Sequence, residues 1–160
     1  IAKKVFSKTT FPIHFIWVGG DNTSLEFQKL NYDLVNLNLQ NKIHFLGTKE
    51  NPLEYFAAAD VFMLCSREDP VGLVALEAAS VKKPILCFDQ AGGMPEFVEA
   101  DCGFIIPYLD FDSMAENIVR LQEERTLLNK LGENAARKVK RHDINIACKE
   151  IESLINSVIE

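Results

Sequence analysis

Short apolar runs recur along the chain at intervals. They are rich in Ile, Val and Phe and lie at Ile13–Val18, Lys42–Leu46, Val61–Cys65, Pro84–Phe88 and Gly103–Ile106. Apolar residues at consecutive positions suit strands of a parallel sheet that is covered on both faces. Trp17 lies in the middle of the first run, so we expect its indole in the core.

Helical patterns separate these runs. The predicted helices are Ser24–Leu37, Pro52–Ala59, Val71–Val81, Ser113–Gln122, Arg125–Arg141 and Ile144–Ile159, and the first residues resemble the end of a further helix. A capping box formed by Ser113 and Glu116 is predicted to open the fourth helix. The alternation of strands and helices predicts a doubly wound α/β domain with a parallel sheet and right-handed crossovers.

Composition limits the class of protein. The chain has 160 residues, a mass of 18.0 kDa, 48% hydrophobic and 25% charged residues, which predicts a single globular domain over residues 1–160. Its net charge of −6 excludes a general nucleic-acid binder. No apolar run approaches the roughly 18 residues of a membrane span, and we find no secretory leader. Because the chain begins at Ile1 rather than Met, we expect it to be part of a longer polypeptide.

Cysteine spacing argues against a disulfide framework or a metal site. The four cysteines, Cys65, Cys87, Cys102 and Cys148, form no Cys-x-x-Cys pair and have no His at ligand spacing. We therefore predict structural thiols and a cytoplasmic protein.

Candidate chemistry follows the predicted strands. In doubly wound sheets, ligands bind outside the carboxyl ends of the strands. Polar or glycine-rich turns occur there, at Gly19-Gly20-Asp21, Gly47-Thr48-Lys49, Ser66–Pro70 and Asp89–Gly93.

The third turn carries the clearest pattern, with carboxylates at Asp69 and Glu77. A helix that begins near Gly72 would direct the free amides of Gly72, Leu73 and Val74 into the crevice and form an anion site for a phosphate. Glu77 could accept hydrogen bonds from the vicinal hydroxyls of a ribose. The alternative is a solvated helix residue, but its apolar neighbours predict a buried and therefore partnered carboxylate.

The order of these motifs resembles the C-terminal, donor-binding domain of GT-B glycosyltransferases, in particular the retaining glycosyltransferase family 4. The matching segments are Val18-Gly19-Gly20, Phe45-Leu46-Gly47, Tyr55–Val61, Asp69–Ala79 and Gly92–Val98, and they span nearly the whole chain. The resemblance implies a Rossmann-like sheet that lacks its first strand. It also implies that the chain is one half of a two-domain enzyme.

The resemblance also assigns roles to residues. Asp69 would be the catalytic acidic residue that contacts hydroxyls of the donor sugar, and Glu77 would bind the ribose. The remaining predicted contacts are Val71, Gly72, Leu73 and Val74 to sugar and phosphate, Gly92, Gly93, Met94, Pro95 and Glu96 around the sugar, and Gly47, Thr48 and Lys49 along the base. Taken alone, the two glycines at 92 and 93 also suit an ordinary turn.

The implied activity is transfer of a sugar from a nucleotide diphosphate sugar to an acceptor hydroxyl with retention of configuration. A UDP-sugar is favoured over a GDP-sugar, and neither a metal nor another cofactor is expected. The acceptor, a carbohydrate or lipid, would bind through an N-terminal domain, so the isolated chain is expected to be a poor catalyst. The basic segment Arg137–Arg141 suits a helix C-terminus, with peripheral membrane contact as an alternative.

Several positions depart from the family pattern. Asp69 stands where Glu is usual, Val71 replaces a common Phe, and Lys82 replaces a Gly whose left-handed conformation costs another residue about 1 kcal/mol. The family's Gly-Arg and Lys-Gly segments do not occur in residues 1–160. Two alternatives therefore stay open, a GT-B nucleotide-sugar epimerase and a non-catalytic nucleotide-sugar-binding module.

Three further candidates have ordinary structural explanations. Asp110-Phe111-Asp112 has the Asp-x-Asp spacing of a metal site, but it precedes a helix and suits a turn and cap. His14 and His44 lie in predicted strands, where packing or surface roles are favoured over catalysis.

Overall fold

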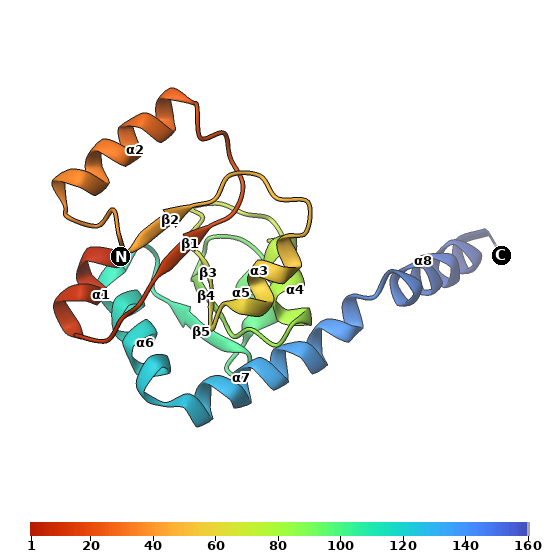
Figure 1. Cartoon of the computed structure of the whole chain (residues 1–160). Helices are drawn as coiled ribbons and strands as arrows, with labels where there is room; N and C mark the ends of the chain where they lie inside the picture. Colours follow the sequence, from red (N-terminus) through yellow and green to blue (C-terminus); the bar gives the residue numbers. More distant parts are fainter. Residues whose placement is uncertain (160) are drawn as a thin grey trace.

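Five short strands form two parallel ladders. β1 (Phe15–Trp17) pairs with β2 (Ile43–Phe45), while β4 (Ile85–Phe88) lies between β3 (Phe62–Leu64) and β5 (Gly103–Ile106). The computed structural model describes residues 1–159 (Figure 1). Each strand falls inside a predicted run and every pairing is parallel, so the predicted α/β class is confirmed.

Helices connect the strands at the predicted places. They are α1 (Ala2–Lys8), α2 (Leu25–Asn36), α3 (Pro52–Ala58), α4 (Leu73–Ser80), α5 (Met94–Val98), α6 (Phe111–Glu123), α7 (Arg125–Lys138) and α8 (Ile144–Ile159), with a 3-10 turn η1 (Val139–His142) before the last. The predicted helix to Arg141 thus ends at Lys138, where its basic last turn complements the helix dipole.

Strand β4 is buried on both faces. Ile85 and Cys87 pack in one apolar cluster with side chains of α4 and α5, whereas Leu86 and Phe88 pack in a second cluster with side chains of α1 and α6. Because successive side chains of a strand point to opposite faces, helices must cover both sides of the sheet. This is the predicted doubly wound arrangement.

The cysteines are free thiols, as predicted. Cys87 and Cys102 are buried, Cys65 is partly buried and Cys148 is exposed. Burial raises the pKa of Cys87 to about 11 and that of Cys102 to about 12, so both thiols stay protonated at neutral pH and act as small apolar side chains.

Within residues 1–159 the two ladders are separate, and the edge of β1 that faces away from β2 is unpaired. The amide of Phe15 donates to the Lys42 carbonyl, and the carbonyl of Trp17 accepts the Leu46 amide. The peptide groups of Phe15 and Trp17 therefore point towards β2. By alternation, the peptide groups of Ile16 face away from β2. The strand order of a doubly wound sheet is 3-2-1-4-5-6. Without its first strand, such a sheet consists of one pair of strands and one group of three. The pair β1-β2 and the group β3-β4-β5 match this division.

The prediction that Trp17 belongs to the core is wrong. Its side chain is 55% exposed, and three of the four regularly spaced leucines of the segment around α2 are exposed as well, with only Leu34 buried. A two-stranded ladder offers too little covered surface to bury the side chains around it. Figure 1 shows α2 lying apart from the other helices, beside β2.

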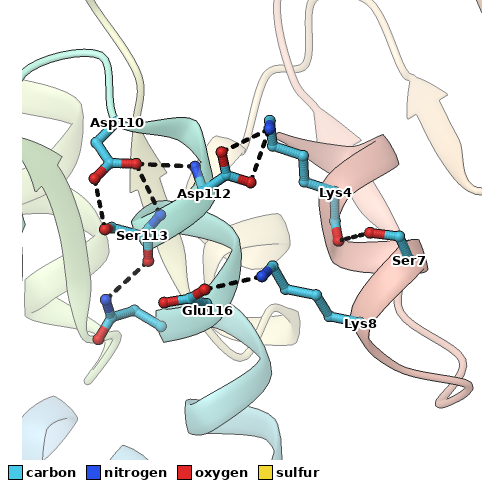
Figure 2. A network of polar contacts seen from close by, with 8 residues as sticks. Lys4, Ser7, Lys8, Asp110, Asp112, Ser113 and Glu116 are labelled. Carbon is cyan, nitrogen blue, oxygen red and sulfur yellow. Dashed lines mark hydrogen bonds and ion pairs between the residues drawn. The ribbon is translucent and has the colours of Figure 1, made fainter.

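Asp110 caps α6. Its Oδ1 accepts hydrogen bonds from the amides of Asp112 (3.1 Å) and Ser113 (3.0 Å), and its Oδ2 accepts one from the Ser113 hydroxyl at 2.6 Å (Figure 2). These bonds, above all that from the Ser113 hydroxyl, lower the pKa of Asp110. The predicted cap role of the Asp-x-Asp segment is confirmed.

The predicted capping box, in contrast, is wrong. Ser113 lies within the first turn of α6 instead of at its N-cap, and Glu116 accepts a bond from Lys8 at 2.9 Å. A second ion pair joins Lys4 to Asp112 at 2.7 Å, so α1 and α6 are linked twice (Figure 2). Such exposed pairs stabilise little. The fully buried Val5 anchors α1 instead.

Helix α8 extends away from the rest of the chain (Figure 1). Several of its apolar residues are exposed, including Ile144, Ile151, Leu154 and Val158. Within residues 1–159, no helix combines the length and the apolar character that crossing a membrane requires.

Substitution Asp110→Ala should lower the thermal unfolding midpoint by a few degrees, because two amides and one hydroxyl lose their acceptor. Asp112→Ala, which removes only an exposed ion pair, is the control and should change the midpoint less. Since the native state lowers the pKa of Asp110, its contribution is present above the unfolded value near 3.8 and is lost as the pH falls. Thermal scans should therefore show the difference between wild type and Asp110→Ala shrinking below about pH 4.

Candidate functional site

The turns that follow the strands meet in pairs. Gly19, after β1, forms an antiparallel bridge with Gly47, after β2, while Asp69, after β3, forms a parallel bridge with Gly92, after β4. Four segments far apart in sequence thus line the carboxyl edge of the strands, where ligands bind in this fold.

The turns after β3 and β4 are held together by their backbones. The Asp69 amide donates to the Ala91 carbonyl at 2.7 Å, and the Gly93 amide donates to the Pro70 carbonyl at 3.0 Å. A Cβ at Gly92 would lie 1.8 Å from the Asp69 carbonyl oxygen, and one at Gly93 would lie 2.6 Å from that of Pro70. Both positions therefore require glycine because two main chains touch there, a role that the sequence did not reveal.

Gly72 turns the chain into α4. It has φ 62° and ψ 53°, a left-handed conformation that favours glycine, and it occupies the N-cap of the helix. A Cβ there would lie 2.9 Å from Leu64 Cδ2 and 3.2 Å from Met94 Cε. The amide of Gly72 donates to Asp69 Oδ1 at 2.6 Å. The predicted start of the helix near Gly72 is confirmed, but this amide is already occupied.

Two amides at the start of α4 have no hydrogen-bond acceptor within residues 1–159. They belong to Leu73 and Val74, the first two helical residues, which are 68% and 44% exposed. The Ala75 amide already donates to the Gly72 carbonyl at 2.7 Å. The positive end of the helix dipole adds to these donors, so this end of α4 favours an anion.

Glu77 lies one turn further along α4, beside a small cavity. The cavity has a volume of about 220 Å³ and is lined by Glu50, Asn51, Pro52, Leu53 and Glu77. Typical small-molecule sites begin at about 300 Å³, so it has room for part of a ligand only. The argument that Glu77 is buried is wrong, because its side chain is exposed.

Four of the five residues that line the cavity follow directly in sequence after the predicted base contacts, Gly47–Lys49. Gly47 is buried and its carbonyl accepts the Gly19 amide at 2.8 Å, and the Thr48 hydroxyl is 3.5 Å from the Gly20 carbonyl. Residues 50–53 line the cavity instead. Pro52 could have indicated this segment in the sequence. A proline in the first turn of a helix marks where the preceding turn, here the one after β2, ends at the crevice.

The other predicted site residues lie around the turn after β4. Met94 is buried and packs in the core cluster, Pro95 is partly buried and Glu96 is exposed. Val71, on the neighbouring turn, is exposed. Of these residues, Val71 and Glu96 present side chains to solvent beside the joined turns.

The histidines lie outside this edge. His14 Nδ1 and His44 Nε2 are 2.9 Å apart and share one hydrogen bond, and the ring of His142 packs edge-on against Phe97. Residues 1–159 contain no group of three His, Cys, Asp or Glu side chains that could hold a metal ion. A hollow of about 440 Å³ on α8 is lined by that helix alone, which cannot enclose a ligand.

Comparison with known families identifies the chain. Residues 2–138 match the model of the family described as "Glycosyl transferases group 1". The chain belongs to this family. The resemblance drawn from the sequence motifs is thereby confirmed.

Two relatives with assigned activities are longer than this chain. It is 30% identical over 105 residues to the N-acetyl-alpha-D-glucosaminyl L-malate synthase of Bacillus anthracis, covering 65% of this chain and 27% of the relative. It is 27% identical over 138 residues to the Escherichia coli UDP-Gal:alpha-D-GlcNAc-diphosphoundecaprenol alpha-1,3-galactosyltransferase, covering 86% and 35%. The chain thus spans about a quarter to a third of the length of these two relatives.

The fold agrees with solved glycosyltransferase structures. Anabaena HepE in complex with UDP superposes with a TM-score of 0.86 at 24% identity, covering 97% of this chain and 44% of HepE. The predicted GT-B fold class is thereby confirmed for this member of the family.

Gly92→Ala should destabilise the folded chain by roughly 3 kcal/mol or more, because the new Cβ would overlap the Asp69 carbonyl and separate the turns. Gly20→Ala is the matched control. Gly20 also has positive φ, but no atom lies within 4 Å of its Cβ position, so only the backbone cost of about 1–2 kcal/mol applies. Urea unfolding measures both values, and equal losses would contradict the contact between the turns.

Proposed function

We propose that the chain binds a nucleotide diphosphate sugar at the carboxyl edge of its strands and forms the donor-binding part of a retaining glycosyltransferase. One observation carries the proposal, namely that α4 presents two free amides at Leu73 and Val74 and, one turn later, an exposed carboxylate beside a small cavity. The amides can donate hydrogen bonds to a diphosphate, and the carboxylate can accept hydrogen bonds from ribose hydroxyls. Their position on the same helix suits the two parts of one nucleotide.

In this arrangement each part of the donor has its own contacts. The amides of Leu73 and Val74 bind a phosphate, and Glu77 accepts hydrogen bonds from the ribose hydroxyls. The base occupies the cavity next to Glu77, between the segment 50–53 and α4, with Gly47–Lys49 at its rim. The sugar lies against the turns at Asp69, Val71 and Gly92–Glu96.

The transfer proceeds with retention of configuration. The bond between the anomeric carbon and the phosphate oxygen breaks, and the acceptor oxygen attacks from the same face. The acceptor proton passes to the departing phosphate. The start of α4 stabilises the negative charge that develops on this leaving group, and the proposal requires no metal or other cofactor.

A UDP-sugar is favoured as the donor, with a GDP-sugar as the alternative. A relative named as a UDP-Gal-dependent galactosyltransferase and a structural neighbour solved in complex with UDP support this choice. Because the chain spans less than half of these proteins, we propose that a second domain supplies the acceptor site for a carbohydrate or lipid and further positive charge. The chain without such a domain would turn over poorly.

Glu77→Ala should weaken the affinity for UDP about tenfold or more, because the ribose loses hydrogen bonds to a charged acceptor. Titration calorimetry at constant ionic strength measures this change. Glu123→Ala, which removes an exposed carboxylate at the end of α6, is the control and should leave the affinity unchanged. Undiminished binding by Glu77→Ala would contradict the proposed site.

Chelation by EDTA should leave UDP-sugar binding and, in the longer protein, transfer unchanged, because helix amides rather than a metal hold the diphosphate. NMR of the product should show the anomeric configuration of the donor. A loss of transfer that Mg²⁺ restores would contradict the metal-free mechanism. An isomerised sugar formed without acceptor would instead indicate an epimerase, and binding without any turnover a non-catalytic module.

A further inference from the structure

We propose that Asn51 reads the base of the donor with the carbonyl of its side-chain amide, and that it selects bases with an imide N–H, uracil or guanine, over cytosine and adenine. This inference rests on the proposed function, since it concerns the cavity beside Glu77 that the base would occupy. Three features support it, namely the place of Asn51 in the cavity wall, a side chain that does not cap its helix, and the orientation of its amide.

Asn51 lies in the wall of the cavity, directly before α3. The segment 50–53 and Glu77 line this cavity, and α3 packs beside α4 (Figure 1). Pro52 and Leu53 supply apolar surface, against which the flat face of a base can lie. The polar side chains next to that surface are Glu50 and Asn51. Within residues 1–159 no hydrogen bond holds the exposed Glu50 carboxylate, whereas the Asn51 amide has a partner.

The side chain of Asn51 is not used as a helix cap. Asn51 is the N-cap of α3, a position where an Asn side chain commonly accepts a backbone amide of the first turn. Here the Glu54 amide donates instead to the main-chain carbonyl of Asn51 at 3.3 Å, and the side chain makes no capping bond. Its amide carbonyl is therefore left for a ligand.

Glu54 sets the orientation of the Asn51 amide. Asn51 Nδ2 donates to Glu54 Oε1 at 3.4 Å, and because an ionised carboxylate only accepts, the NH2 end of the amide must face Glu54. Glu54 does not line the cavity, whereas Asn51 does. The end of the amide on the cavity side is thus the carbonyl oxygen, Oδ1.

A carbonyl at this place distinguishes two classes of base. The imide groups of uracil (N3–H) and guanine (N1–H) donate, so each can form a hydrogen bond to Asn51 Oδ1. Cytosine N3 and adenine N1 carry lone pairs at the corresponding positions, which a carbonyl oxygen repels. To bind either base, the amide would have to turn over and lose its bond to Glu54. Asn51 is therefore the residue that determines specificity, and Glu54 is a positioning residue.

Affinities for UDP, GDP, CDP and ADP, measured by titration calorimetry on the full chain, test this assignment. Wild type should bind UDP and GDP about tenfold more tightly than CDP and ADP, the effect of one hydrogen bond. Asn51→Ala should weaken UDP binding about tenfold and bring the UDP and CDP affinities within about threefold of each other. Asn41→Ala, which removes an exposed amide before β2, is the control and should keep the wild-type ratio.

Glu54→Gln tests the positioning role separately. A glutamine at this position can donate as well as accept, so the Asn51 amide can turn over without losing its partner. The ratio of UDP to CDP affinity should then fall, chiefly because CDP binds more tightly than to wild type. Circular dichroism verifies that each variant is folded. An unchanged ratio in Glu54→Gln would overturn the proposed orientation of the amide.

Two outcomes would overturn the role of Asn51 as the reader of the base. In the first, wild type shows no preference between UDP and CDP, or Asn51→Ala keeps the preference of wild type. In the second, Glu50→Ala loses the preference while Asn51→Ala retains it, which would assign the reading to Glu50.

The same titrations separate this inference from the proposed function. UDP binding that depends on Glu77 but shows no preference among the bases would leave the proposed function standing and overturn the role of Asn51. A wild-type chain that binds none of the four nucleotides would overturn both. Uracil and guanine share the imide group, so the comparison of UDP with GDP decides which of the two the chain takes.

Discussion

The close contact between two main chains, those of Asp69-Pro70 and Ala91–Gly93, is the constraint on which the site depends. Two backbone hydrogen bonds join these turns, and neither Gly92 nor Gly93 has room for a Cβ. The contact brings the end of β3 to the end of β4 at a fixed separation. From there Asp69 and Gly72 set where α4 begins, and with it the direction of the amides and the carboxylate of Glu77.

The contact between the two turns is supported by the apolar core around β4. Strand β4 is buried along its whole length and divides its side chains between two apolar clusters that hold helices against both faces of the sheet. Apolar burial of this kind dominates the stability of a domain, whereas the exposed ion pairs between α1 and α6 add little. The turns after β3 and β4 therefore rest on a strand whose four residues are all buried.

The other side of the crevice has a weaker foundation. Strands β1 and β2 form a ladder of their own, with Trp17 and most of α2 exposed. The turns after these strands are joined through Gly19 and Gly47, and the cavity beside Glu77 is lined by the segment that follows. The two sides thus differ in packing, although both belong to one edge.

The sequence by itself determined the local features of this protein. Consecutive apolar residues predicted all five strands, helical spacing predicted the helices α2, α3 and α4 between the first four of them, and the motifs from Val18 to Val98 indicated the family. Only the tertiary structure decided which side chains are buried and what each turn touches. Trp17 and Glu77 are exposed, Asp110 and not Ser113 caps α6, and Gly92 meets the backbone of Asp69. The physical reason is that periodicity reflects neighbours along the chain, whereas burial and close contact depend on segments brought together from elsewhere in it.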